Sequence, residues 1–487
     1  METPRTEAEW RRLVLRLERE LQWRAEELKE QRELNRRQRE TIARLEQRIA
    51  DLEMRVRQDS TTSSAPPSSD KPWDKEARRK ERNRRKAEKK KSKGGAKKGH
   101  KGSRRTAVTP DEVERYEPTQ CEECGYRLSS EAGRPAGRRQ VTELSPLQPR
   151  VTEHRVYSKG CRVCGHRTRA GFPRQVVALG AFGPRLRALM AALRGAYGLS
   201  LRKSRQFLRE VFGVRVSHGA LSENEARFGR LLKGNYDMVD DWLSRAPRLF
   251  VDETSWFVRS VLWWLWVKSD GKTRCYKIQA RRDTQAAMTF LGNFAGLLTT
   301  DELASYNGYD ERKRQLCVGH LHRRIAGLAL HPAMAEWAEK VDKAFEAMFV
   351  VWHRIRDGTE DFDDRRVLMD APQRELTELF EQGKNHEHKR VRGLCTRALG
   401  KWKMWWRFVV VGSEPTNNEA ERALRPAVIF RKLSHGSRSE RGSRFFERMM
   451  TVVETLRGHG HDVFDFLSRT VARAARGQTL PLLPLGG

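Results

Sequence analysis

The segment from residue 249 to residue 301 constrains the fold more than any other part of the chain, because apolar stretches of strand length alternate there with a turn and a helical run. The dipeptide Asp270-Gly271 is a strong signal for a tight hairpin turn. The pattern predicts three antiparallel strands, a helix and a further strand, at residues 249–254, 261–267, 273–279, 284–294 and 296–301. The first and the last of these strands each deliver an acidic residue, Asp252 and Asp301.

Three antiparallel strands, a helix and a further strand form the ribonuclease-H-like order, in which Asp252 and Asp301 would converge. We expect a third acid from a helix that begins at Glu419, where Glu419 and Glu421 are both available. Three clustered carboxylates can bind two divalent ions for in-line phosphoryl displacement, and magnesium suits such oxygen ligands. From spacing alone the choice stays open, because Glu419 could close a capping box with Thr416 and Glu421 could simply favour the positive end of its helix.

Residues 8–57 carry a seven-residue repeat with two interleaved positions that are mostly apolar. One position is apolar in six of seven repeats and holds Val14, Leu21, Leu28, Asn35, Ile42, Ile49 and Val56. The other is polar in the middle of the segment, at Arg24, Gln31 and Gln38. Over seven heptads this pattern predicts a coiled coil at residues 1–57, through which the chain forms at least a dimer. A long amphipathic helix packed on its own chain is the alternative.

Residues 58–110 lack a hydrophobic pattern and are expected to form a disordered linker and a basic arm. Between residues 71 and 106 there are 18 Lys and Arg against 4 acids, a local excess of +14. A solvated tail is one interpretation, and an arm that lies along DNA phosphates and releases counterions is the other. The residues that we expect to contact DNA are Arg84, Arg85, Lys89, Lys90, Lys97, Lys98 and Lys101.

The net charge of the whole chain is +33, so +19 is left on the other 451 of the 487 residues and the folded body is basic as well. Such an excess favours a nucleic-acid partner. The longest unbroken apolar run, residues 261–267, is far shorter than the ~20 residues of a membrane span. The N-terminus has no apolar segment of the kind that a secretory signal needs. We therefore expect an intracellular protein without a membrane partner.

Two C-x-x-C-G motifs lie 36 residues apart, at Cys121–Gly125 and Cys161–Gly165. Each motif lets two thiolates reach one tetrahedral zinc ion, and the glycine permits the tight turn that follows. Together they predict a structural zinc site in a zinc ribbon at residues 111–172, with strands at 139–144 and 151–157. Its ligands would be Cys121, Cys124, Cys161 and Cys164. A redox dithiol would need only one motif, and disulfides are disfavoured inside a cell.

The remaining segments have helical patterns. Residues 173–246 have a helix-turn-helix outline that could contact DNA, although many all-α domains share it. Residues 324–411 predict an all-α insertion, with an apolar stripe that is more typical of a core than of a base-stacking surface. The stripe consists of Trp337, Val341, Phe345, Met348, Trp352 and Ile355. Cys317 and His320 could ligate a second metal, but a structural role is favoured.

Several stretches resemble the transposases of the insertion sequence 66 family, in the order expected for nearly the whole chain. The matching text is PPSSD at 66–70, VTEHRVYSKGC at 151–161, VDETSW at 251–256, TTDELASYNGY at 299–309, CVGHLHRR at 317–324 and NNEAERALRP at 417–426. The resemblance implies a multidomain α+β chain whose catalytic domain, at residues 247–480, is ribonuclease-H-like and of the DDE type. The helical insertion would lie within this domain.

The resemblance further implies metal-dependent DNA cleavage and strand transfer at transposon ends. Asp252, Asp301 and Glu421 would bind two magnesium ions, and Glu421 is preferred because it is the acid of the Ala-Glu-Arg in the last motif. Basic residues after the third acid would lie where substrate phosphates approach: Arg422, Arg425, Arg431 and Lys432. The expected partners are double-stranded DNA, a second copy of the chain and element-encoded helper proteins, at the bacterial nucleoid in the cytoplasm. The alternatives are a non-catalytic DNA-binding derivative and a metal-dependent nuclease without strand transfer.

Overall fold

A computed structural model of the chain describes residues 7–59, 62, 107–130, 133–144 and 147–486. The chain divides into two compact units, which we describe separately. The first consists of Met1–Asp74, Pro173–Leu201 and Gly219–Gly487, and the second of Lys75–Phe172 and Arg202–His218.

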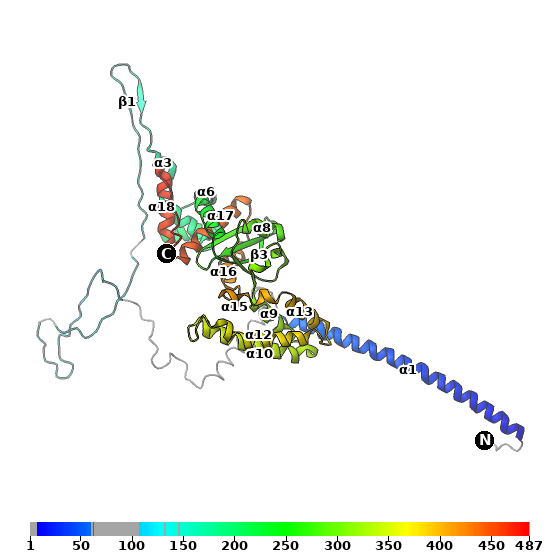
Figure 1. Ribbon diagram of the computed structural model, residues 1–487. Helices are drawn as coiled ribbons and strands as arrows, with labels where there is room; N and C mark the ends of the chain where they lie inside the picture. The colour runs from blue at the N-terminus through cyan, green and yellow to red at the C-terminus, as the bar shows by residue number, and fades with distance from the viewer. Residues whose placement is uncertain (1–6, 60–61, 63–106, 131–132, 145–146, 487) are drawn as a thin grey trace. The chain divides into compact units, whose positions relative to one another are not determined.

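The N-terminal repeat forms one continuous helix, α1 (Glu7–Arg57), of 51 residues, drawn in blue in Figure 1. The apolar residues of the repeat lie mostly on its surface, with Leu21 66% and Ile49 57% exposed. The last turns differ, because Met54 is only 2% exposed and packs into a core of the same unit. The predicted helix is therefore present, with an apolar stripe that is open along most of its length.

A five-stranded mixed sheet with the order β5-β4-β3-β6-β7 lies at the centre of the first unit. Its strands are β3 (Arg248–Val258), β4 (Val261–Ser269), β5 (Arg274–Gln279), β6 (Leu297–Thr300) and β7 (Arg314–Leu316), with α8 (Thr284–Leu291) between β5 and β6. The first three strands are antiparallel to one another, whereas β6 is parallel to both β3 and β7. The predicted order of strands and helix is thus present.

Two details of the sheet differ from the sequence analysis. Strand β3 does not end at residue 254 but continues to Val258, because it pairs with β4 along its whole length in a long hairpin. Strand β7 was not predicted, since Arg314-Gln315-Leu316 has no strand-like pattern. Arg314 is nevertheless buried, because it donates hydrogen bonds to the Thr300 hydroxyl and the Asp301 carbonyl, both at 3.0 Å.

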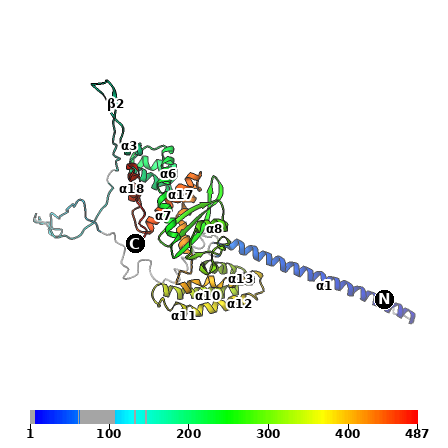
Figure 2. The ribbon, with the colours of Figure 1, turned by 45° about the horizontal axis from the view of Figure 1, so that its top comes forward.

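Helices cover both faces of the sheet, as Figures 1 and 2 show. On one face, Phe250 and Trp256 of β3 pack against α16 (Asn418–Ser434) and α17 (Glu440–Gly458). On the other face, Leu249 and Val251 pack against a second set of helices. That set includes α4 (Pro184–Gly195), α6 (His218–Leu231), α7 (Lys233–Ser244), α8 and α18 (Val463–Arg476). The alternation of apolar side chains along β3 therefore supplies two separate cores.

One stretch, Arg174–Gly195, is long and apolar enough to cross a membrane by length and composition. The structure breaks this stretch into α3 (Arg174–Leu179) and α4, with a positive φ of 58° at Gly180. Ala188 and Ala191 of α4 are fully buried against the sheet. Burial of this kind is typical of a helix in the core of a folded domain.

The helical insertion follows β7, and Figure 2 shows its helices gathered side by side. They are α9 (Val318–Leu328), α10 (Pro332–Arg356), α11 (Arg365–Leu368), α12 (Asp370–Gly383), α13 (Lys389–Gly400), α14 (Trp402–Trp405) and α15 (Arg407–Val411). The predicted stripe of α10, from Trp337 to Ile355, is buried in one core with Phe380 and Trp405. The stripe is core, as the sequence pattern favoured.

The second unit contains α5 (Leu201–Phe212) and a short hairpin of β1 (Ser158–Gly160) with β2 (Arg167–Arg169) around the second C-x-x-C-G motif. The strands predicted at 139–144 and 151–157 are absent from the described residues of these segments. Their side chains are mostly exposed, so alternation there does not reflect a buried face. Closing a hairpin across one tight turn costs less conformational entropy than pairing two segments that are distant in the sequence.

Substitution of Trp256 tests the packing of the sheet against α16 and α17. Trp256 is fully buried, its ring lies 4.4 Å from that of Phe446, and its indole N–H donates to Ser437 at 3.1 Å. We expect Trp256→Ala to lower the free energy of unfolding by about 3–5 kcal/mol, measured by urea denaturation with near-UV circular dichroism. Trp23→Ala, at a site 61% exposed on α1, is the control and should change it by less than about 0.5 kcal/mol. Equal effects would contradict this packing.

Candidate functional site

Parallel pairing of β3 with β6 brings Asp252 and Asp301 to one face of the sheet. Phe250 pairs with Thr299 in this ladder, and each acid lies two residues further along its own segment. Because successive side chains of a strand point to opposite faces, Asp252 shares the face of Phe250, which packs toward α16. The first-turn residue Glu421 of that helix completes the group.

A buried asparagine fixes the start of α16 over the strands. The side-chain amide of Asn417 donates to the Val251 carbonyl at 2.8 Å, and its backbone N–H donates to the Cys317 sulfur at 3.1 Å. The backbone N–H of Cys317 in turn donates to the Thr300 carbonyl at 2.9 Å, directly before Asp301. Burial raises the pKa of Cys317 to about 11, so the thiol stays protonated. Cys317 therefore has the structural role that the sequence analysis favoured.

The charges of Asp301 and Glu421 both act on Asp252. Burial, followed by the charges of Glu253, Asp301 and Glu421, raises the pKa of Asp252 well above its usual range. From α9, Arg323 donates to Glu421 Oε1 at 2.9 Å, and His320 Nε2 lies 3.8 Å from the same oxygen. Burial and the charge of Arg323 lower the pKa of His320, which keeps its ring neutral. One cation thus offsets part of the negative charge.

Two further acids near the site, Glu253 and Glu419, are paired with other residues. Glu253 points to the opposite face of the sheet, where it accepts hydrogen bonds from Tyr306 and from Arg282 Nη2. Glu419 pairs with Arg274 at 3.1 Å and with Arg422 at 3.0 Å. Of the two acids weighed for the third position, Glu421 contributes to the raised pKa of Asp252, whereas Glu419 is paired with two arginines. Glu419 forms no capping box with Thr416, because α16 has no side-chain cap.

Comparison with known proteins connects this geometry to a family. A family model described as Transposase IS66 family matches residues 180–444, more than half of the chain, and this range includes all three acids. The chain belongs to this family. A second model, a family of unknown function (DUF6444), matches residues 7–106. As its name says, the IS66 family is a family of transposases.

Two relatives of this IS66-family chain come from Sinorhizobium fredii (strain NBRC 101917 / NGR234), and both are named as uncharacterized proteins. The first, y4qI, is 26% identical over 339 residues, which cover 63% of this chain and 62% of the relative. The second, y4hP, is 23% identical over 421 residues, which cover 75% of this chain and 73% of the relative. The chain thus spans somewhat less than two thirds of the first relative.

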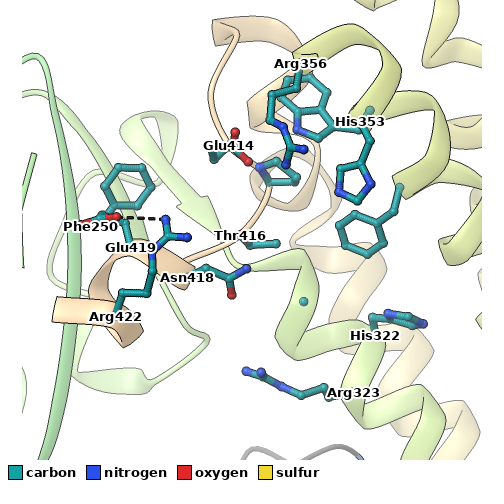
Figure 3. A pocket seen from close by; sticks show the side chains of 14 residues that line it. Phe250, His322, Arg323, His353, Arg356, Glu414, Thr416, Asn418, Glu419 and Arg422 are labelled. Carbon is teal, nitrogen blue, oxygen red and sulfur yellow. Dashed lines mark hydrogen bonds and ion pairs between the residues drawn. The ribbon is translucent and has the colours of Figure 1, made fainter. Parts of the chain in front are cut away.

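Beside the acids of this IS66-family site lies a cavity of about 420 Å³ between α9, α10 and the start of α16. Figure 3 shows Arg323, His353, Arg356 and Arg422 around it, with Arg422 bonded to Glu419. His320 and Arg323 were not predicted as site residues. The Cys317-x-x-His320 spacing is only a weak metal motif, although His320 and Arg323 both lie on α9, the helix that faces Glu421.

The predicted DNA-contacting residues fall into three groups. Arg422, Arg425 and Lys432 of α16 are exposed. Arg431 turns inward instead and donates to the hydroxyls of Thr254 at 3.0 Å and Ser255 at 2.6 Å, so it ties α16 to β3. The seven residues of the basic arm, from Arg84 to Lys101, lie outside the described part of the chain.

Each C-x-x-C-G motif forms the same tight turn. Gly125 and Gly165 have positive φ values of 71° and 73°, and the N–H of each donates at 2.9 Å to the carbonyl of the first cysteine of its motif. Backbone N–H groups aimed at the sulfurs lower the pKa of Cys121 and Cys161, which favours thiolates. Within the described residues, however, the four sulfurs do not gather at one point. The group that meets a metal-ligand spacing there is Asp51, His331 and His388, with ligand atoms within 4.8 Å of one another.

Burial and the crowding of like charges should make the charged form of Asp252 costly for stability. Because folding raises its pKa, the acid stabilises the fold below its unfolded pKa of about 3.9 and this contribution is lost as pH rises through the folded pKa. We expect Asp252→Asn to raise the melting temperature at pH 7 and to lose this advantage near pH 4. Differential scanning calorimetry across this range measures it. Asp310→Asn is the control, because a backbone hydrogen bond lowers the pKa of Asp310, and no gain is expected.

Proposed function

We propose that this chain is a DNA transposase that cleaves phosphodiester bonds at transposon ends and joins the freed ends to target DNA. The observation that carries the proposal is the convergence of Asp252, Asp301 and Glu421 from two parallel strands and one helix, in a member of the IS66 family. In the sheet order β5-β4-β3-β6-β7, the strands β5, β4 and β3 are antiparallel and the strands β3, β6 and β7 are parallel. This order supports a ribonuclease-H-like catalytic domain.

The donor set fits hard divalent cations. Three carboxylates offer oxygen atoms, which magnesium prefers, and the neutral His320 ring lies 3.8 Å from Glu421 Oε1. Burial and then the charges of neighbouring acids raise the pKa of Asp252, and a bound cation would stabilise its charged form. Asp252, Asp301 and Glu421 would hold two ions. When bound, such ions supply activation of the attacking oxygen and stabilisation of the leaving oxygen.

The residues of the chain then position the substrate. Water attacks a phosphodiester phosphorus, and the bond to the 3′ oxygen breaks so that this oxygen leaves as a hydroxyl. The freed 3′ hydroxyl loses its proton and attacks a target phosphodiester phosphorus at the same centre, and the bond from that phosphorus to the target 3′ oxygen breaks, so that this oxygen leaves as a hydroxyl. Exposed Arg422, Arg425 and Lys432 on α16 would contact the DNA phosphates on either side. Arg323, which neutralises Glu421 in the free protein, would have to release it when cations bind.

The other parts of the chain would bind and pair the DNA ends. Self-association through α1 is supported by its exposed apolar stripe, and a structural zinc site at the two motifs by turns that favour thiolates. The basic arm would add salt-sensitive DNA binding. We place this activity in the bacterial cytoplasm, with element-encoded helper proteins as further partners. A non-catalytic DNA-binding derivative and a nuclease without strand transfer are the alternatives.

The catalytic assignment predicts which carboxylates are essential. Asp252→Asn, Asp301→Asn and Glu421→Gln should each lower magnesium-dependent cleavage of end-containing DNA by at least about 100-fold, since each removes a ligand. Glu419→Gln is the matched control on the same helix and should cleave within a few-fold of wild type. Loss of activity in Glu419→Gln but not in Glu421→Gln would exchange their roles.

The products of the same assay separate the alternatives. Joined products require a 3′ hydroxyl nucleophile, so their formation supports a transposase. Cleavage without joining favours a nuclease, and binding without cleavage favours a regulatory derivative.

The role of α1 is tested by placing a charge in its stripe. Ile49 is 57% exposed on the single chain, so Ile49→Asp should leave the fold of one subunit intact. In a coiled coil it would be buried, and we expect the dimer measured by analytical ultracentrifugation to dissociate. Gln47→Asp introduces the same charge on the opposite face and should stay dimeric. A dimer in both variants would argue against self-association through this stripe.

A further inference from the structure

Two helices of the insertion begin with a histidine whose side chain caps the helix. His331 Nδ1 accepts the N–H of Ala333 at the start of α10, and His388 Nδ1 accepts the N–H of Arg390 at the start of α13, both at 3.2 Å. Both rings are buried, at 3% and 5% exposure. Since each Nδ1 uses its lone pair as an acceptor, the hydrogen-bond pattern assigns the proton of each neutral ring to Nε2.

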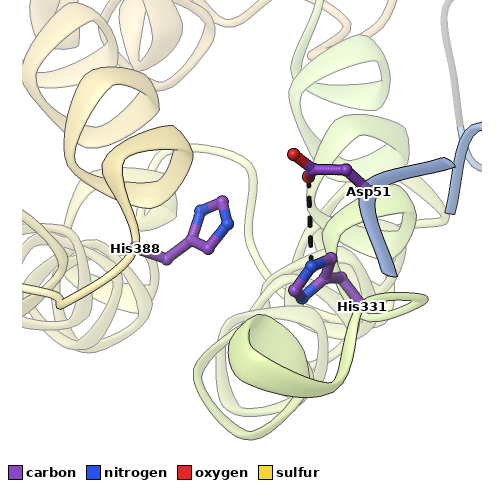
Figure 4. Close-up of side chains that lie close together, drawn as sticks. All are labelled: Asp51, His331 and His388. Carbon is purple, nitrogen blue, oxygen red and sulfur yellow. Dashed lines mark ion pairs between the residues drawn. The ribbon is translucent and has the colours of Figure 1, made fainter. Parts of the chain in front are cut away.

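A carboxylate from the other end of the sequence, that of Asp51, lies next to both rings, since ligand atoms of Asp51, His331 and His388 are within 4.8 Å of one another. Figure 4 shows Asp51 of α1 joined to His331 by an ion pair, with the His388 ring to their left. Asp51 Oδ1 lies 3.9 Å from His331 Nε2 and 3.2 Å from Arg390 Nη1. We call the site formed by His331, His388 and Arg390 the histidine-cap pocket. Two helix N-termini, two N–H donors and a guanidinium converge there, which is the chemistry that binds anions.

The spacing of Asp51, His331 and His388 also resembles a metal site, but the tautomers argue against one. A nitrogen that carries a proton has no lone pair to offer to a metal. Both rings would have to give up their helix caps before Nε2 could coordinate. The guanidinium of Arg390 beside the carboxylate would also repel a cation.

Asp51 does not fill the histidine-cap pocket. At 3.9 Å its oxygen is beyond hydrogen-bond range of His331 Nε2, and neither Nε2 atom has a hydrogen-bond partner. A buried donor left without a partner costs about 1–3 kcal/mol. A group with more acceptor oxygens than a carboxylate would satisfy both donors.

A basic cavity adjoins the histidine-cap pocket and shares Arg390 with it. This cavity of about 490 Å³ lies between the end of α1 and helices α9 and α13. Its lining includes the basic residues Arg324, Lys389, Arg390 and Arg397, and none of its described lining residues is acidic. The charge therefore favours an anion at the place from which the histidine-cap pocket would be reached.

We propose that the histidine-cap pocket is a phosphate-binding site and that Asp51 is its built-in competitor. A tetrahedral phosphate supplies enough oxygens for both Nε2–H groups and for Arg390. Occupation by phosphate displaces the carboxylate and so loosens the contact between α1 and the insertion. The site goes beyond the proposed catalytic centre, and it rests on the proposed function only if its phosphate belongs to DNA.

The competitor is tested by titrating the full chain with inorganic phosphate in an isothermal calorimeter at constant ionic strength. Asp51→Asn should bind phosphate at least about tenfold more tightly than wild type, a gain of about 1.4 kcal/mol. Glu46→Gln removes the same charge from an exposed position of α1 and should bind like wild type. Equal affinities in Asp51→Asn and Glu46→Gln would overturn the proposal.

The donors are tested in the Asp51→Asn background by His331→Asn and His388→Asn. Asparagine is a good helix N-cap, so each variant keeps its helix start while it removes the Nε2–H donor. Each should weaken phosphate binding about tenfold or more, because each removes a hydrogen bond to a charged group. Unchanged binding, with folding verified by circular dichroism, would contradict the site. Zinc binding that is lost in His388→Asn would also overturn it in favour of a metal.

The source of the phosphate is found by competition. If a short DNA duplex displaces inorganic phosphate from Asp51→Asn, the site binds the DNA backbone. If phosphate stays bound when the duplex is saturating, the site takes a free phosphate group. The second result leaves the catalytic proposal untouched, because the acids of the sheet are tested separately by cleavage.

Discussion

The hydrogen bond from the Asn417 amide to the Val251 carbonyl holds the candidate site together. It joins the loop before α16 to the middle of β3, one residue from Asp252. Next to it, the N–H of Val318 donates to the Pro415 carbonyl at 2.9 Å, so the insertion leaves and re-enters the sheet domain at one place. A helical domain of this size can therefore interrupt the chain between Asp301 and Glu421 without disturbing their approach. Asn417 is fully buried, so water does not compete for its hydrogen bond to the Val251 carbonyl.

The same hydrogen bond helps to position several acidic side chains near one another, and the fold must accommodate their negative charge. Asp252 lies among Glu253, Asp301 and Glu421, and the structure offsets this charge unevenly. Glu253 is neutralised on the opposite face by Arg282 and by the Tyr306 hydroxyl, whereas Glu421 is paired with Arg323. Arg282 therefore acts on the opposite face of the sheet, and Arg323 of α9 is the cation that reaches the group of acids beside α16.

The sequence predicted the local parts of this arrangement better than the distant ones. Alternating apolar residues and Asp270-Gly271 predicted the β3–β4–β5 meander, because pleat and hairpin turn are local properties. Spacing could not choose between Glu419 and Glu421, since the choice depends on Arg274 of β5, which pairs with Glu419. Short β7 was missed because tertiary hydrogen bonds, not pattern, hold its buried Arg314. The contact of Asp51 with His331 and His388 joins segments too far apart for any local pattern to reveal.

Helix α1 also acts as a lever, because a long rigid helix turns a small rotation at one end into a large displacement at the other. With about 1.5 Å of rise per residue, its N-terminal end lies about 66 Å from Asp51 along one rigid axis. The lever is attached to the insertion near its other end, through Asp51 and the buried Met54. A tilt of about 5° at this attachment moves the far end by about 6 Å, which is more than the pitch of one helical turn. Small changes at a few buried side chains are thus amplified into displacements large enough to change which surfaces meet at the N-terminal end.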